Sequence, residues 1–114
     1  MDSKIVTYQR VIKQIFNKYI ELFNRRPEPD AETLVVMDDT EGHYIIHTIG
    51  WQETKRVWNT TLYVRIRNEK FWIEIDWTSP GIATDLLEAG IPKADIVLAF
   101  HHPQMRPLTE FAVA

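Results

Sequence analysis

Histidines are the first side chains to test for chemistry, because imidazole can bind a metal ion or carry a proton. The chain has His43 and His47, four residues apart, and the adjacent pair His101 and His102. His43 and His47 fall in a strand pattern, where this spacing holds them about 13 Å apart, too far to bind one ion together. His101 and His102 point to opposite sides of an extended chain. We therefore predict no metal site, and expect the second pair to hydrogen-bond the C-terminal tail.

Carboxylates are plentiful, but their positions fit turns and solvated strands. Asp38, Asp39 and Glu41 precede Gly42, and aspartate side chains commonly bond the amides of a turn. The acidic residues at positions 74 and 76 alternate with apolar residues in a strand pattern, so both are expected on its polar face. A general acid–base pair at these two positions is the less favoured alternative.

The sequence shows no nucleophile motif and no glycine-rich phosphate-binding loop. There is no cysteine, no serine in a Gly-x-Ser-x-Gly elbow, and the four glycines lie far from one another. We therefore predict that the protein is not an enzyme and needs no cofactor. An enzyme that uses His101 with acidic neighbours is the weakest alternative.

Basic residues gather on one predicted hairpin, residues 55–72, between aromatic residues. Basic and aromatic side chains together suit the binding of nucleic acid strands, through phosphate contacts and base stacking. However, Glu74 and Asp76 share that face, and the net charge of −3 weakens attraction to phosphates. A small nucleic-acid-binding module is therefore the alternative function, with these candidate residues: Lys55, Arg56, Arg65, Arg67 and Lys70.

Aromatic side chains also suggest protein association. The chain has four tryptophans and four tyrosines, and its last four residues are apolar. Aromatic residues and arginine are enriched at the centres of protein interfaces. We therefore predict that the chain meets a protein partner or a second copy through some of the following residues: Trp51, Trp58, Trp72, Phe111 and Val113.

Length and composition indicate one ordinary globular domain over residues 1–114. Hydrophobic residues make up 45% and charged residues 25% of the chain, which is typical of a domain with a packed core. The longest apolar run, Ile96 to Phe100, is far shorter than the roughly 18 residues of a membrane span. Since there is no cysteine and no apolar leader, a cytoplasmic location with no membrane contact is expected.

The segment from Lys4 to Phe23 predicts the clearest helix. Ser3 is the expected N-cap, and Pro27 with Pro29 ends the pattern. Further apolar residues widen the stripe on its apolar face, which indicates a helix lying across a sheet. The residues of this stripe recur every three or four positions: Ile5, Tyr8, Ile12, Ile15, Tyr19 and Leu22.

Four strands are predicted after the helix, over residues 33–37, 43–51, 57–67 and 71–77. In the third strand the even positions are apolar, and in the fourth the odd positions are apolar. Antiparallel pairing of 66 with 71, 64 with 73 and 62 with 75 satisfies both patterns if Asn68 and Glu69 form a two-residue loop. The same register places Arg65 over Trp72 in a cation–π contact.

The last third of the chain predicts shorter elements. A helix is expected from residue 81 or 82 to 89, capped by Thr78 or Ser79 and followed by Gly90, and then a single helical turn over residues 92–95. Residues 96–100 form a buried strand or an extended segment, and the tail follows the surface until its apolar end docks. The fold class is therefore α+β: a long N-terminal helix packed on an antiparallel sheet of about four strands, followed by a short helix and an extended C-terminal segment.

Several short pieces after residue 80 recur with a characteristic spacing. They are Gly81-Ile82-Ala83, Glu88-Ala89-Gly90-Ile91-Pro92-Lys93, Asp95-Ile96-Val97-Leu98, Phe100-His101, Pro103 and Phe111-Ala112-Val113-Ala114. This spacing resembles the signature of the XisI family, the fdxN element excision controlling factors of cyanobacteria. The similarity continues upstream through LYVRIRNEKFWIEIDWTSPGIA and HYIIHTIGWQETKRVW, and leaves out only residues 24–33.

This resemblance implies an accessory factor that controls the excision of a DNA element by a site-specific recombinase. It also implies a companion protein of the XisH type. The family brings no catalytic or binding residues that can be placed on this chain. Because the chain is acidic overall, we expect it to act by binding the companion or the recombinase, and not by binding DNA directly.

Overall fold

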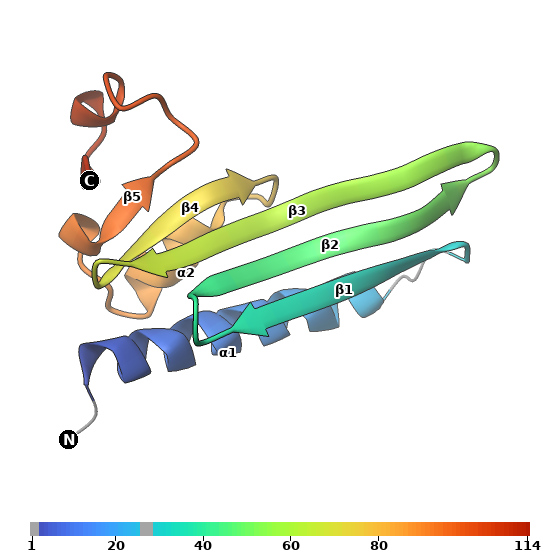
Figure 1. The fold of residues 1–114 in the computed structure, drawn as a ribbon, viewed down its shortest axis with the longest axis horizontal. Helices are drawn as coiled ribbons and strands as arrows, with labels where there is room; N and C mark the ends of the chain where they lie inside the picture. The colour runs from blue at the N-terminus through green and yellow to red at the C-terminus, as the bar shows by residue number, and fades with distance from the viewer. Residues whose placement is uncertain (1–2, 26–28) are drawn as a thin grey trace.

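Five strands form one sheet in the order in which they occur along the chain (Figure 1). The computed structural model describes residues 3–25 and 29–114. The first four strands pair antiparallel through sequential hairpins, and the fifth lies parallel to the fourth. The strands are β1 (Ala31–Asp38), β2 (His43–Gln52), β3 (Lys55–Arg67), β4 (Lys70–Asp76) and β5 (Ile96–Leu98).

Two α-helices lie on one face of this sheet (Figure 1). They are α1 (Lys4–Asn24) and α2 (Ile82–Glu88), and neither carries an apolar stretch long enough to cross a bilayer. One-turn 3-10 helices follow as η1 (Lys93–Asp95) and η2 (Arg106–Leu108). The α+β fold is confirmed, with one more strand than the roughly four predicted. The extra strand is the apolar run after residue 95, which the sequence allowed as a buried strand.

The N-terminal helix begins as predicted, since the Ser3 hydroxyl accepts a hydrogen bond from the amide of Val6 at 3.2 Å. The centre of its predicted apolar face is buried, and Ile5 and Tyr19 are partly buried. At the C-terminal end Leu22 is 46% exposed, and Phe23 packs against the core instead. The predicted stripe alternates steps of three and four residues, which average 3.5, whereas a straight helix has 3.6 residues per turn. The stripe therefore rotates slowly away from the buried face along the helix. Pro27, expected to end the helix, lies outside the described residues.

The β3–β4 hairpin keeps the predicted register near its loop. Ile66 pairs with Phe71, and Arg65 and Val64 pair with residues 72 and 73. The register then shifts between Val64 and Tyr63, so Leu62 lies opposite Asp76 and not opposite residue 75. This irregularity was not predicted, because a β-bulge adds a residue without changing the apolar alternation on the partner strand.

The shift turns Asp76 toward the helices and separates it from Glu74. Its carboxylate accepts hydrogen bonds from the amides of Thr78 at 2.9 Å and of Ile82 at 2.8 Å. It therefore holds the start of α2, whose N-cap residue is Gly81 and not the predicted Thr78 or Ser79. The two acidic residues do not share the polar face that the sequence predicted.

The core fills the space between the helical layer and the sheet. Helix α1 contributes Phe16 and Ile12, and the stacked rings of Tyr8 and Phe71 lie 4.8 Å apart. The largest side chains with less than 2% exposure come from both layers: Tyr44, Phe16, Phe71, Ile12, Ile46, Leu62, Ile73, Ile82, Leu86, Ile96, Val64 and Val97.

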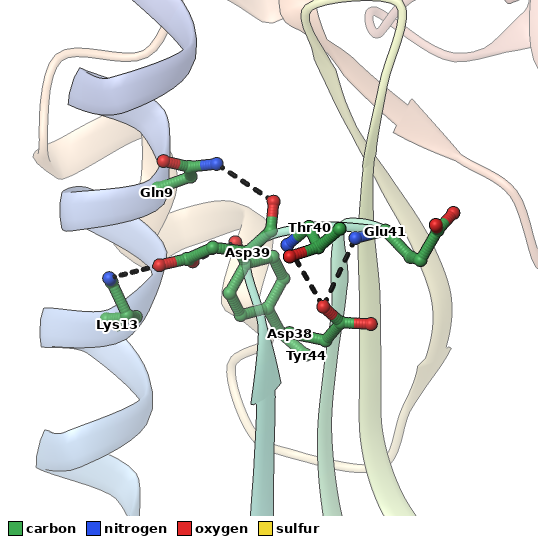
Figure 2. Close-up of polar contacts among 7 residues, drawn as sticks. All are labelled: Gln9, Lys13, Asp38, Asp39, Thr40, Glu41 and Tyr44. Atoms are coloured by element: carbon green, nitrogen blue, oxygen red, sulfur yellow. Dashed lines mark hydrogen bonds and ion pairs between the residues drawn. The ribbon is translucent and has the colours of Figure 1, made fainter.

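The β1–β2 turn is bonded to itself and to α1, as Figure 2 shows. The Asp38 carboxylate accepts from the amides of Thr40 and Glu41 at 3.0 and 3.2 Å. The Asp39 carboxylate accepts from the ammonium group of Lys13 at 2.7 Å. The acidic residues therefore stabilise a turn, as the sequence indicated. Asp39 also ties α1 to the β1–β2 turn.

Tyrosine hydroxyls bond three aspartates at the edges of the core. They join Tyr44 to Asp39 at 2.6 Å, Tyr8 to Asp95, and Tyr19 to Asp85. Burial, together with the hydrogen bond to the carboxylate, raises the pKa of Tyr19 to about 12. Hydrogen bonds from Lys13 and Tyr44 hold the pKa of Asp39 below its ordinary value. These hydrogen bonds tie α1 to η1 and to α2, and β2 to the turn before it.

Candidate partner interface

Among the described residues no α-helix lies on the sheet face opposite α1 and α2, and the C-terminal segment meets this face only at its β4 end (Figure 1). The buried residues Tyr44 and Ile46 of β2, and Leu62 and Val64 of β3, point toward the helices. Their neighbours in the strands therefore point to the other side, the open face. A water-facing sheet surface normally carries polar side chains, but this one includes the following apolar residues: Leu34, Val36, Ile45, Ile49, Trp51, Trp58, Tyr63 and Trp72.

A cluster of two tryptophans and one arginine lies near the distal end of the β2–β3 hairpin. The Arg56 guanidinium carbon is 5.1 Å from the centre of the Trp51 ring and 5.8 Å from that of Trp58. Trp51 is 50% exposed and Trp58 is 62% exposed. Exposed, mutually packed tryptophan and arginine side chains are the residue types that dominate binding at protein interfaces. We call these three residues the Trp–Arg cluster.

The two histidines of β2 lie on the open face, each in contact with β3. His43 shares a hydrogen bond of 2.8 Å with the Tyr63 hydroxyl, and His47 one of 2.9 Å with the Thr60 hydroxyl. The Trp58 ring meets His47 edge-on, with ring centres 4.5 Å apart, and the Nε2 atom of His47 is buried without a hydrogen-bond partner in the described part of the chain. Within that part, no three potential ligands gather around a common metal position.

The other end of the open face is covered by the C-terminal segment. The partly buried Trp72 donates its indole hydrogen bond to the carbonyl of Arg67 at 2.9 Å. The guanidinium groups of Arg67 and Arg106 lie 5.4 and 5.7 Å from its ring centre. The predicted contact of Arg65 with this ring is wrong, because the Arg65 guanidinium turns to the Glu74 carboxylate, 3.6 Å away.

Arg106 also holds the tail in place. Its guanidinium group donates to the carbonyls of Ala99, His101 and Val113. Phe111 packs partly buried against the core, as the sequence predicted, whereas Val113 is 51% exposed. The His102 ring accepts a hydrogen bond from the amide of Gln104 at 3.1 Å, which agrees with the expected role in the tail.

The basic candidates for nucleic acid binding do not form one patch. Arg56 belongs to the Trp–Arg cluster, while Arg65 pairs with Glu74 near the other end of the sheet. Lys70 donates to the carbonyl of Ala114. Lys55 pairs with Gln52 at the start of β3, where strand alternation turns it toward the helical side. Binding roles for these residues stay predictions.

Two exposed apolar features were not identified as candidates from the sequence. Residues 34–36 of β1 are exposed by 37%, 40% and 48%, and Trp77 is 81% exposed beyond the end of β4. The signal for the first feature was visible in the sequence. Leu34, Val35 and Val36 form a run without apolar–polar alternation, and such a run indicates a strand that is apolar on both faces.

A surface hollow of about 310 Å³ lies where the start of β1 meets the β2–β3 hairpin. Its walls include Trp51, Thr48 and Val57, with Asp30 and Glu53 as its titratable side chains. By strand alternation Thr48 and Val57 point to the helical side of the sheet and Trp51 to the open face. The hollow is therefore not confined to the open face.

Comparisons with known proteins agree with the architecture. The family model described as XisI protein matches residues 1–113. The crystal structure of fdxN element excision controlling factor XisI from Anabaena variabilis is 41% identical, with a TM-score of 0.87, over 98% of this chain and 100% of that chain. A XisI-like protein from the same organism is 28% identical, with a TM-score of 0.90, over 96% of this chain and 99% of that chain. Among curated proteins, no match was found.

Proposed function

Because the chain belongs to the XisI family, we propose that it is an accessory regulatory factor that controls site-specific excision of a DNA element, acting through protein partners. The observation that carries this proposal is the match to an excision controlling factor, at 41% identity over 98% of the chain. A recombinase performs the strand exchange in such a system, so a regulatory factor needs a binding surface and no catalytic centre of its own.

The open face is the surface that we assign to the partner. Its apolar side chains include the two tryptophans of the Trp–Arg cluster, and at that end of the face no segment of the described residues covers them. Burying this surface against a partner would remove exposed apolar area from water, at roughly 25 cal/mol per Å². The first partner to test is a companion of the XisH type, and the second is the recombinase of the element.

Direct nucleic acid binding by the hairpin 55–72 is less well supported. Four of its five basic residues already make contacts within the chain. Arg65 pairs with Glu74 and Lys70 with a tail carbonyl, while Arg56 and Arg67 lie over tryptophan rings. Affinity for DNA comes largely from cations that neutralise phosphates. Binding to a 20-base-pair duplex at increasing salt tests this alternative, since phosphate contacts give a steep loss of affinity.

The experiment that tests the main proposal is co-purification of the tagged chain with its XisH-type companion, with the mass of the complex measured by light scattering. Trp58→Ala on the open face should weaken the complex at least tenfold, because a tryptophan that anchors an interface typically carries more than 1.4 kcal/mol of binding energy. Leu22→Ala is the control, because Leu22 is 46% exposed on α1, in the opposite layer. A complex that forms equally well with both variants would exclude the open face, and failure of the unaltered chain to bind either partner would exclude the partner model.

A further inference from the structure

One edge of the sheet is paired with the C-terminal tail, and the other edge has no strand beside it in the described part of the chain. On the β5 side, the amide of Ala112 donates to the carbonyl of Ile96 at 2.8 Å, so the tail lies along that edge. On the other side, β1 is the last strand, and the described residues place no strand beyond it. An edge strand presents unpaired amides and carbonyls, which can pair with another chain.

The register of β1 and β2 shows which backbone groups face that edge. The amide of Trp51 donates to the carbonyl of Asp30 at 2.9 Å, so the pair of residues 30 and 51 is hydrogen-bonded. In antiparallel strands every second pair is bonded in this way, and β1 pairs with β2 without a register shift. The backbone groups of the even-numbered residues therefore face β2, and those of Thr33, Val35 and Met37 face the open edge.

Most of the features that protect an edge strand are lacking in β1. Proteins guard such edges with proline, charged side chains (lysine above all), a β-bulge or a covering segment. The charged residues of β1 stand near its two ends and leave its centre apolar. Residues 31–38 contain no proline and no lysine, and their pairing is regular. At the centre of the strand, Leu34, Val35 and Val36 are each more than a third exposed, although they belong to both faces of the sheet. An added strand would cover both faces at this point.

The charge around the edge selects among the strands that could be added. Residues 29–42 include five acidic residues and no lysine or arginine. One of the five, Asp39, is paired with Lys13. A second copy paired antiparallel about Val35 would bring Glu32 opposite Asp38, and like charges directly opposite each other are destabilising. Lysine or arginine at both ends of an added strand would instead meet these carboxylates.

We propose that β1 is a docking strand for an extended segment of a partner protein, which joins the sheet as a sixth strand. The segment has an apolar centre, which covers Leu34 and Val36, and basic residues at both ends. Main-chain hydrogen bonds fix its register, and the charges of the edge select its sequence. This inference concerns the edge of the sheet alone and does not depend on a role in excision.

Two synthetic peptides test the proposal directly. Both have nine residues, blocked ends and a central Thr-Val-Thr-Val-Thr segment, and they carry either two lysines or two glutamates at each end. In nuclear magnetic resonance titrations, the lysine peptide should slow hydrogen exchange of the amides of Val35 and Met37 at least tenfold. The glutamate peptide should bind at least ten times more weakly.

A matched pair of variants separates strand addition from simple charge attraction. Val35→Pro removes an amide that faces the open edge and leaves the bonds to β2 in place, since proline is tolerated on edge strands. Val35→Thr keeps the amide and the β-branched shape. The proline variant should lose peptide binding while the threonine variant keeps it, and a thermal melt of each variant checks that the chain is folded.

Three results would overturn the proposal. The first is equal binding of the lysine peptide to the proline variant, which would show attraction without strand pairing. The second is no change in the two amides at millimolar lysine peptide. The third is a chain that is already a dimer without peptide and becomes a monomer as Val35→Pro, which would make a second copy the occupant.

Discussion

Gly42 ends the β1–β2 turn, and replacing it with alanine should destabilise the protein far more than the same change at Gly90. Both glycines have positive φ angles, +76° and +91°, so an alanine side chain adds backbone strain of about 1–2 kcal/mol at either position. Their surroundings differ. A Cβ atom at Gly42 would lie 2.4 Å from the carbonyl oxygen of Ile66, whereas at Gly90 nothing lies within 4 Å.

The clash at Gly42 falls on a backbone that already carries a hydrogen bond. The amide of Ile66 donates to the carbonyl of Gly42 at 3.0 Å. Because Gly42 is buried, moving the strands apart would leave these groups without a partner, at a cost of about 1–3 kcal/mol. We therefore expect Gly42→Ala to cost about 2–5 kcal/mol and Gly90→Ala about 1–2 kcal/mol.

Urea unfolding followed by circular dichroism measures both variants. With an m value of about 1.5 kcal/mol per molar urea, the extra cost should separate the two midpoints by about 0.7–2 M. The m values must agree, so that midpoints can be compared. Equal midpoints for the two variants would refute the argument from the carbonyl of Ile66, and an unchanged midpoint for Gly90→Ala would refute the estimate of backbone strain.

Three further predictions concern ionisation and packing. The pKa of Tyr19 is raised from 10.0 to about 12, so its contribution to stability is complete below pH 10 and is lost as the pH rises toward 12; Tyr19→Phe should flatten part of this loss in urea titrations. The pKa of Asp39 is lowered from 3.8, so its contribution is present above pH 3.8 and is lost as the pH falls through the lowered pKa; Asp39→Asn should make unfolding below pH 4 less dependent on pH. Trp72→Ala should lower the free energy of unfolding by about 2 kcal/mol in thermal melts, because two guanidinium groups cover the partly buried ring. Trp58→Ala, at a residue that is 62% exposed, should lower it by less than about 0.5 kcal/mol.

Local patterns predicted those parts of the fold that local physics determines. The apolar stripe placed α1, and alternation in two neighbouring strands placed Ile66 opposite Phe71. Alternation could not reveal the register shift beyond Val64. An extra residue in β4 changes which residues lie opposite each other, but it leaves the order of apolar and polar residues along β3 unchanged. The parallel pairing of β5 depends on a crossover through α2, and no short stretch of sequence encodes such a contact.

The candidate site was predictable only in part. Trp51, Arg56 and Trp58 were named as separate candidates, but they meet only because Trp51 pairs with Arg56 across the β2–β3 hairpin and Trp58 lies two residues further along β3. These pairs lie between the turn and the irregularity next to His47, so they follow from the turn itself. The sequence placed that turn at residues 53–55, whereas β3 already begins at Lys55. Arg106 covers Trp72 although the two residues are 34 positions apart. The residues between them carry no pattern that predicts this contact.

The unequal edges of the sheet also limit how many chains can associate through strand pairing. A sheet that is open at both sides can add copies at each end and grow without limit. Here the tail lies along the β5 side, where Ala112 bonds Ile96, so β1 is the edge of the described sheet that ends without a paired segment. Strand pairing through β1 alone is monovalent: one added chain fills that edge, and pairing there does not propagate into a fibre.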